Sequence, residues 1–439
     1  MTDSSNTMRE ARDAQYRSWS IRENLLDLGN RIDETLQSAY RRSAYMAGHN
    51  QLKVLRAFQE ARVSEAGFGG TTGYGYDDLG RDQLETVYAA AFGAEAALVR
   101  MQVSSGTHAL AAGLFGVLRP GDRFISLTGD VYDTLHDVIG AEDDESDTGS
   151  LCDYGVAYET IPLKDGRADL DRIKERLGDA ADVKLCFIQR SRGYSSRPAL
   201  TISDIETVIE AVRSVRPEMI IMVDNCYGEF MEEKEPTEVG ADLIAGSLIK
   251  NPGGGIAPTG GYLAGRRELD EKTAVRLTAP GIGSEVGPTL GQTRLLAQGF
   301  YFAPHTVMET VKGLDFAAAL MAELGVETTP GAGTVRSDII QVLRFNGEAE
   351  MVAFVQSIQA AAPVDSFVTP VPASMPGYRS SVIMAAGAFI QGSSLELSAD
   401  GPVAPPWQAY LQGGLVYDQV RLAALLAAER MLQTQERSV

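Results

Sequence analysis

Between about residues 97 and 264, short apolar segments alternate with longer helical segments, and this alternation constrains the fold more than any other feature. It is typical of a parallel sheet covered by helices on both faces. Leu185–Ile188 and Ile220–Val223 are apolar without interruption, as expected of strands buried on both faces. Strands are expected at Ala97–Arg100, Arg123–Leu127, Ala157–Pro162, Val183–Ile188, Met219–Val223, Leu243–Leu248 and Gly261–Ala264. Helices are expected at Gln83–Phe92, Thr107–Leu118, Leu170–Leu177 and Ser203–Val215.

The flanking regions have different patterns. Residues 8 to about 65 carry apolar side chains at helical spacing, whereas the chain beyond about residue 300 mixes helices and strands. The helices expected there are Val311–Leu324 and Glu348–Ala361, and the strands are Ile339–Arg344, Val382–Ala386 and Ser394–Leu397. We therefore expect an N-terminal helical arm at 1–68, a large α/β domain at 69–297 and a small α+β domain at 298–439.

Charge and composition exclude several classes of protein. Lys and Arg total 39 against 59 Asp and Glu, and a net charge of −20 disfavours binding to nucleic acid or to anionic membranes. The three cysteines do not form a disulfide or metal motif, and the four histidines are scattered, so no metal site is expected. No apolar segment approaches the ~20 residues that span a bilayer. We expect a cytoplasmic protein.

Polar residues follow three of the expected strands, where ligands of α/β sheets bind. The segment Ser104–His108 opens a helix, and it is equally consistent with a phosphate site and with a simple N-cap. Asp224 ends a buried strand, where a carboxylate is costly without a cationic partner. A purely structural buried ion pair is the alternative to a functional role. Lys250, flanked by glycines, suits a Schiff base if burial lowers its pKa, although a solvent-facing lysine is the alternative.

The order of these residues is more specific than any one of them. A pyridoxal 5′-phosphate (PLP) enzyme has these parts in this order: a phosphate-binding turn, then an aspartate at a strand end, here Asp224, and then Ser247-x-x-Lys250. Competing motifs are missing, because the sequence contains no P-loop, no complete dinucleotide-binding fingerprint and no GxSxG nucleophile elbow.

Longer motifs resemble the methionine gamma-lyase family of PLP enzymes, in the branch called aluminium resistance proteins, which is distantly related to cystathionine gamma-lyase. They are Thr72–Arg81, Gln189–Tyr194, Val223–Glu229, Gly246–Gly255 and Glu396–Pro402. The resemblance implies the fold-type-I architecture of PLP-dependent transferases, with a seven-stranded, mostly parallel sheet. It also implies a homodimer or homotetramer with shared active sites.

The resemblance also assigns roles to single residues. Lys250 would form the Schiff base, Asp224 would pair with the ring nitrogen and Tyr132 would stack on the ring and assist the leaving group. The phosphate would be held by Ser105, Gly106, Thr107 and Ser247. Tyr74, with Tyr76 and Arg81 as further candidates, would reach the neighbouring subunit's phosphate, unless the tyrosines pack in the core.

One departure concerns the substrate carboxylate. Related lyases bind it with an arginine just before a C-terminal Leu-Ser, where this chain has Glu396. The cation must then come from elsewhere. Arg190 or Arg192 is the expected source, although either could simply lie at the surface, and Arg379 is a weaker candidate.

The expected function is therefore PLP-dependent elimination of a thiolate or halide from the γ or β carbon of an L-amino acid, through an external aldimine and a carbanion. The substrate amine would displace Lys250, which then removes the Cα proton. Two alternatives stay open at this point: transamination or aldol cleavage on the same fold, and a non-catalytic PLP-binding stress-response protein.

Overall fold

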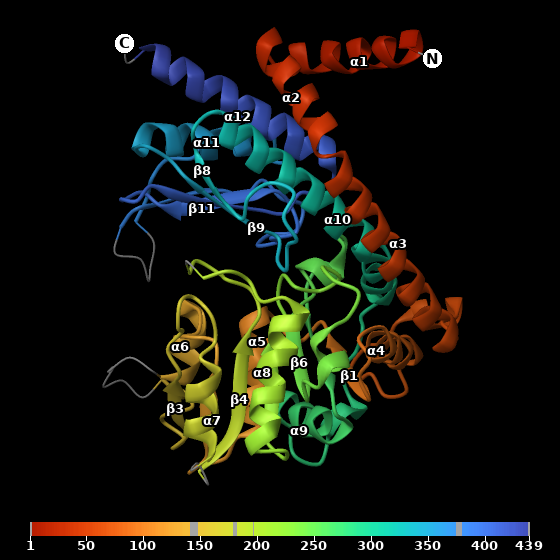
Figure 1. Ribbon diagram of the computed structural model, residues 1–439. Helices are drawn as coiled ribbons and strands as arrows, with labels where there is room; N and C mark the ends of the chain where they lie inside the picture. Colours follow the sequence, from red (N-terminus) through yellow and green to blue (C-terminus); the bar gives the residue numbers. More distant parts are fainter. Residues whose placement is uncertain (1, 141–147, 179–181, 196, 375–379, 438–439) are drawn as a thin grey trace. The chain divides into compact units, whose positions relative to one another are not determined.

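The computed structural model describes residues 2–140, 148–178, 182–195, 197–374 and 380–437 (Figure 1). Its chain divides into two compact units, Gly48–Pro304 and a second made of Met1–Ala47 with His305–Val439. The expected division into an arm, a large domain and a small domain stays a prediction.

The unit Gly48–Pro304 is built around a seven-stranded sheet. Its strands are β1 (Ala96–Arg100), β2 (Arg123–Ser126), β3 (Ala157–Thr160), β4 (Val183–Gln189), β5 (Ile220–Asp224), β6 (Leu243–Ser247) and β7 (Gly261–Gly265). The order is β1-β7-β6-β5-β4-β2-β3. Within the row β6-β5-β4-β2-β3 all neighbouring strands are parallel. β7 runs antiparallel to both of its neighbours, β1 and β6. The expected strands are confirmed, and the fold is α/β of fold type I.

Helices cover both faces of this sheet (Figure 1). They are α4 (Leu79–Ala91), α5 (Gly106–Val117), α6 (Asp133–Ile139), α7 (Leu170–Gly178), α8 (Ile202–Val215), α9 (Arg267–Leu277) and the first part of α10 (Thr293–Glu323). Short 3₁₀ helices occur at η1 (Glu65–Gly69), η2 (Pro236–Val239), η3 (Asn251–Gly253) and η4 (Gly283–Glu285). Cys186 and Ile188 of β4 pack in the core with α4, α7 and α8, whereas Leu185 and Phe187 pack in the core with α5, α6 and α9. Burial on both sides explains why Leu185–Ile188 of this strand is apolar without interruption.

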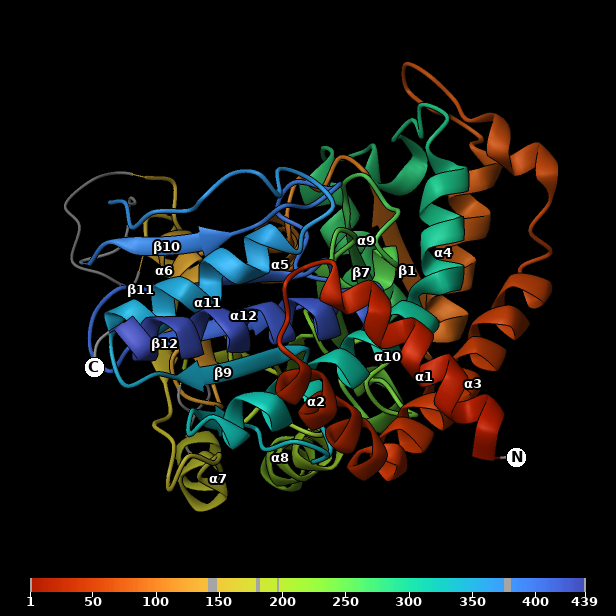
Figure 2. The same cartoon turned by 90° about the horizontal axis from the view of Figure 1, so that it is seen from above.

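The second unit contains a five-stranded antiparallel sheet of order β10-β11-β12-β9-β8, seen with α11 and α12 in Figure 2. Its strands are β8 (Glu327–Thr329), β9 (Ile340–Arg344), β10 (Val382–Ala385), β11 (Ser398–Pro402) and β12 (Gln408–Gln412). Its helices are α1 (Thr2–Arg17), α2 (Glu23–Thr35), α11 (Glu348–Ala360), α12 (Tyr417–Arg437), the start of α3 (Gln37–Glu60) and the rest of α10.

The strand expected at Ser394–Leu397 is wrong, because β11 begins only at Ser398. Leu395 and Leu397 are buried and gave the segment its apolar pattern, but their backbone lies in an irregular turn. β8 and β12 were not expected from the sequence. None of the described helices is long and apolar enough to cross a membrane. Among the described residues, no cluster of three or more His, Cys, Asp or Glu side chains is placed to hold a metal ion.

Candidate active site

The start of α5 lies where β5 and β6 end. A Cβ atom added to Gly106 would lie 3.2 Å from Sγ of Cys226 and 3.5 Å from Cβ of Ser247. The same atom would lie 3.9 Å from Nζ of Lys250. The structure therefore brings together the segments that follow β1, β5 and β6, and glycine leaves the space between them free of side chain.

The N-terminus of α5 has two properties at once. Ser105 is its N-cap, because its hydroxyl accepts a hydrogen bond from the backbone N–H of His108 at 3.0 Å. The N–H groups of Gly106 and Thr107 make no hydrogen bond within the described parts of the chain. Free N–H groups at the positive end of a helix favour an anion. The N-cap and the phosphate interpretation are therefore compatible.

Asp224, the last residue of β5, is 5% exposed. Its Oδ1 accepts a hydrogen bond from the backbone N–H of Cys226 at 3.0 Å. Burial raises the pKa of this carboxyl above its ordinary value, although the Lys250 ammonium opposes that shift. A buried carboxylate needs a cation nearby, so Asp224 is suited to stabilise positive charge in this space.

Lys250 follows β6, and its Nζ lies 4.1 Å from the centre of the Tyr227 ring. The pKa of Lys250 was expected to be lowered, through burial, but its net shift is upward. Burial does lower it, but the neighbouring Cys226, Tyr227 and Asp224 outweigh that effect and raise the pKa of Lys250. The expectation was wrong because it considered burial without the acidic groups that share the site.

Tyr132 is the N-cap residue of α6, just after β2. Its hydroxyl is hydrogen-bonded to Oγ1 of Thr107 at 3.0 Å, and its backbone N–H donates to Oε1 of Gln189 at 3.0 Å. Burial, reinforced by the charge of Asp224, raises the pKa of the Tyr132 phenol. The hydroxyl therefore keeps its proton at neutral pH and lies against the start of α5.

Comparison with known proteins agrees with this geometry. A family model described as methionine gamma-lyase matches residues 25–432. The chain belongs to the methionine gamma-lyase family. The protein YnbB of Bacillus subtilis (strain 168) is 47% identical over 405 residues, covering 92% of this chain and 96% of YnbB.

Solved structures extend the comparison. The carbon-sulfur lyase involved in aluminum resistance from Clostridium novyi NT is 48% identical with a TM-score of 0.92, and the match covers 96% of this chain and 99% of that one. The pyridoxal-5′-phosphate dependent protein YhfS from Escherichia coli is 18% identical, with a TM-score of 0.60 over 88% and 96% of the two chains. That second likeness shows the shared fold.

The PLP cofactor of the methionine gamma-lyase family fits these residues. A phosphate would occupy the space beside Gly106, next to the free N–H groups that begin α5 and to the buried Ser247. Asp224 would hold the protonated ring nitrogen, and Lys250 would bond to the aldehyde carbon.

Arg190 is fully buried, and its guanidinium is held by acidic and amide groups. It pairs with Glu232 at 3.1 Å and Glu235 at 3.4 Å, and donates to Oδ1 of Asn225 at 2.8 Å. A Cβ atom on Gly228 would lie 2.4 Å from its Cδ, so that glycine makes room for the side chain. These contacts favour a structural role for Arg190 over binding of the substrate carboxylate.

Arg192 lies in the segment that follows β4 and is 4% exposed. A Cβ atom on the adjacent Gly193 would lie 4.0 Å from Cβ of Tyr132, which places this segment beside the site. The segment that carries Arg192 therefore lies beside Tyr132, whereas the Arg190 guanidinium is held by acidic and amide groups in contacts of its own. Arg379 lies outside the described residues.

Tyr74 and Tyr76 are 70% and 59% exposed, so neither packs in the core, and their ring centres are 5.4 Å apart. Arg81 is buried and donates from Nη1 to the carbonyl of Gly75 at 2.7 Å and to that of Gly287 at 3.3 Å. Arg81 therefore holds the segment that presents the two tyrosines.

Three residues of the site were not predicted from the sequence. Gln189 ends β4 and positions Tyr132, and a polar residue after an apolar strand was the available signal. Tyr227, beside Lys250, has a left-handed backbone with φ of +71°. Glu229 is fully buried, and burial raises its pKa to about 8 while Oε1 accepts from the Tyr262 hydroxyl at 2.8 Å. No pattern in the sequence distinguished Glu229 from an exposed glutamate.

Proposed function

We propose that this protein is a PLP-dependent lyase that eliminates a leaving group, a thiolate or a halide, from the γ or β carbon of an L-amino acid. The observation that carries the proposal is the space beside Gly106, which the start of α5, the end of β6 and Lys250 share. Asp224 lies close enough to Lys250 for the two charges to shift each other's pKa.

When bound, the cofactor supplies an electron sink that makes a bond at Cα of the substrate easier to break. Lys250 accepts the Cα proton on Nζ. In γ-elimination it must release that proton before Nζ can accept a second one from Cβ. It must be neutral to do so. Asp224 is one of the groups that raise the lysine's pKa. The neutral amine is therefore favoured when the Asp224 carboxylate pairs instead with another cation, the protonated ring nitrogen of the cofactor.

Two further side chains would orient the substrate. Tyr132 would donate its phenol proton to the departing group. The phenol is protonated at neutral pH even at its ordinary pKa, and burial raises that pKa further. The planar guanidinium of Arg192 suits bidentate binding of the substrate carboxylate.

The protein is proposed to act as a homo-oligomer, a dimer or a tetramer, in which Tyr74 reaches the neighbouring subunit's phosphate. The support is the exposure of Tyr74 on a segment that Arg81 holds in place. A rigid exposed aromatic residue is a common anchor at interfaces.

The test is a panel of L-amino acids that carry sulfur or halogen at the β or γ carbon, offered to the PLP-loaded protein without an amino acceptor. We expect ammonia and a 2-oxo acid to be released together with the thiol or halide. With L-cystathionine, β-elimination gives pyruvate and homocysteine, whereas γ-elimination gives 2-oxobutanoate and cysteine, so the products identify the carbon attacked.

Lys250→Ala should abolish release of ammonia, whereas Lys164→Ala, at an exposed lysine distant in sequence from the site, should leave it unchanged. Product formation only in the presence of a 2-oxo acid acceptor would indicate transamination. That result, or no ammonia from any compound with PLP bound, would refute the lyase assignment.

A further inference from the structure

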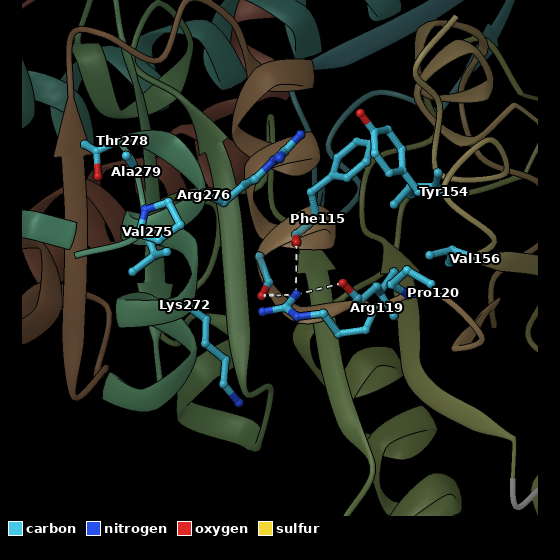
Figure 3. A pocket seen from close by; sticks show the side chains of 14 residues that line it. Phe115, Arg119, Pro120, Tyr154, Val156, Lys272, Val275, Arg276, Thr278 and Ala279 are labelled. Atoms are coloured by element: carbon cyan, nitrogen blue, oxygen red, sulfur yellow. Dashed lines mark hydrogen bonds between the residues drawn. The ribbon is translucent and has the colours of Figure 1, made fainter. Parts of the chain in front are cut away.

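Figure 3 shows a cavity of about 370 Å³ in the unit Gly48–Pro304. It lies at the end of α5 opposite to Gly106. Its walls are the last turn of α5, one side of α9 and the segments around residues 151–156 and 278–280. Gly116 of α5 lets the two helices approach closely, because a Cβ atom there would lie 2.9 Å from Cα of Thr273 in α9. The volume falls within the range of small-ligand pockets, about 300–1,000 Å³.

The charge of this cavity is opposite to that of the protein. None of its fourteen lining residues is acidic, and Arg119, Lys272 and Arg276 are among them, although the whole chain carries −20. Lys272 is paired with Glu268 at 2.5 Å. Arg119 and Arg276 form no ion pair with any residue of the described ranges. Two guanidinium groups therefore line the cavity without a carboxylate partner among the residues that the structure describes.

An aromatic pair stands beside these cations. The Phe115 and Tyr154 rings meet edge to face with centres 5.8 Å apart, and the Arg276 guanidinium lies 4.7 Å from the centre of the Phe115 ring. Figure 3 shows Arg276 extending toward these two rings. Tyr154 is 54% exposed, so a flat group can stack on its ring.

Arg119 presents its charge in a fixed position. Its Nη1 donates to the carbonyls of Phe115 at 3.2 Å, Gly116 at 2.9 Å and Leu118 at 2.7 Å, which close the C-terminus of α5 (Figure 3). Its Nη2 makes no hydrogen bond within the described parts of the chain and remains available to a ligand. A guanidinium already held in place loses little conformational entropy on binding.

We propose that this cavity is a binding site for a small aromatic anion, separate from the site at Gly106. The anionic group would bind Arg119 and Arg276, and the flat ring would stack on Tyr154. Aromatic acids and nucleotides both combine a flat ring with an anionic group, and the experiment compares the two classes.

The experiment is calorimetric titration of the PLP-saturated full chain, so that the phosphate space at Gly106 is filled. The main probe is phenyl phosphate, and inorganic phosphate, AMP and phenylpyruvate are titrated separately. We expect saturable binding of one phenyl phosphate per chain and at least tenfold weaker binding of inorganic phosphate. Tighter binding of AMP identifies a nucleotide site, and tighter binding of phenylpyruvate identifies an aromatic-acid site; both support the proposal.

Arg276→Ala should weaken phenyl phosphate binding at least tenfold. Arg294→Ala is the matched control, because Arg294 is also exposed and lies 5.7 Å from the Phe68 ring centre, outside the cavity. If Arg276→Ala unfolds, Tyr154→Ala at the exposed ring provides the same test. Absence of saturable binding, equal binding of inorganic phosphate, or equal loss in Arg294→Ala would overturn the proposal.

Discussion

Asp224 and Lys250 show that neighbouring charges, rather than burial alone, decide the protonation of a buried residue. Burial raises the pKa of Asp224 and lowers that of Lys250, but each residue stabilises the charged form of the other. The two effects oppose each other at both residues, and at Lys250 the acidic neighbours prevail. Asp224 is therefore one of the acidic neighbours, with Cys226 and Tyr227, that raise the pKa of Lys250.

Asp224→Asn is expected to lower the rate of elimination by about 100-fold or more, within the usual range for a group that controls proton transfer. Asparagine keeps an oxygen for the Cys226 N–H, so the local fold should persist. The control is Asp242→Asn, another buried aspartate that pairs with Arg213 at 2.7 Å, at the start of β6. It should lower stability but leave the activity of the folded protein unchanged. Activity of Asp224→Asn within about threefold of wild type would contradict this role.

Glu229 makes stability depend on pH. Burial raises its pKa to about 8 from an ordinary 4.5. Between these values the folded state binds more protons than the unfolded chain, so the free energy of unfolding falls as pH rises, by up to about 1.4 kcal/mol per pH unit. Glu229→Gln cannot ionise and retains an acceptor for Tyr262. Relative to wild type, it should therefore be more stable at pH 8 than at pH 5.

Denaturant unfolding across this pH range measures the effect. Glu206→Gln, at an exposed position of α8, should give a curve parallel to that of wild type. If the Glu229→Gln curve is also parallel, Glu229 is not protonated in the folded protein at neutral pH.

At the scale of elements, α5 links two ends of the same unit. Its N-terminus opens on the space at Gly106, and its last turn forms a wall of the aromatic and cationic cavity. Close packing against α9 at Gly116 fixes the helix between them.

Gly106→Ala is expected to weaken PLP binding at least tenfold, because the methyl group would occupy the proposed phosphate space, 3.2 Å from Sγ of Cys226. The stability of the cofactor-free protein should change by no more than about 1 kcal/mol, since alanine is favoured in helices. Gly48→Ala, in α3 with no atom within 4 Å of the added methyl, should leave PLP affinity unchanged. Fluorescence titration of the cofactor-free protein with PLP measures both, and unchanged affinity in Gly106→Ala would contradict the placement of the phosphate.

At the scale of the whole molecule, what the sequence predicted well depended on the local pattern of apolar residues. Uninterrupted apolar segments within β4 and β5 identified the sheet, and polar residues at or just after the ends of strands identified Asp224 and Lys250. Tertiary contacts decided the rest. Arg190 is buried because Glu232 and Glu235, more than forty residues later, fold against it, and no local pattern carries that information.

The small antiparallel sheet was less predictable for a related reason. β11, with the sequence Ser-Ala-Asp-Gly-Pro, has little intrinsic preference for strand and pairs because β10 and β12 flank it. Apolar side chains of the preceding turn, including Leu395, gave a stronger but misleading signal.

Assembly is tested by mixing two inactive variants. If Tyr74 completes the site of a neighbouring subunit, Lys250→Ala and Tyr74→Ala should each be inactive or severely impaired alone. After unfolding and refolding together, mixed oligomers should contain some sites with both native residues, so activity should exceed that of either variant refolded alone. No gain in an oligomer shown to contain both chains would indicate that each subunit builds its own site.

The most direct test of the central claim is to locate the lysine that bonds to PLP. The PLP-loaded protein is reduced with borohydride, digested and mapped by mass spectrometry. The account predicts a single stoichiometric pyridoxyl group on Lys250, which disappears on removal of PLP before reduction. A pyridoxyl group on another lysine, with Lys250 unmodified, would contradict it.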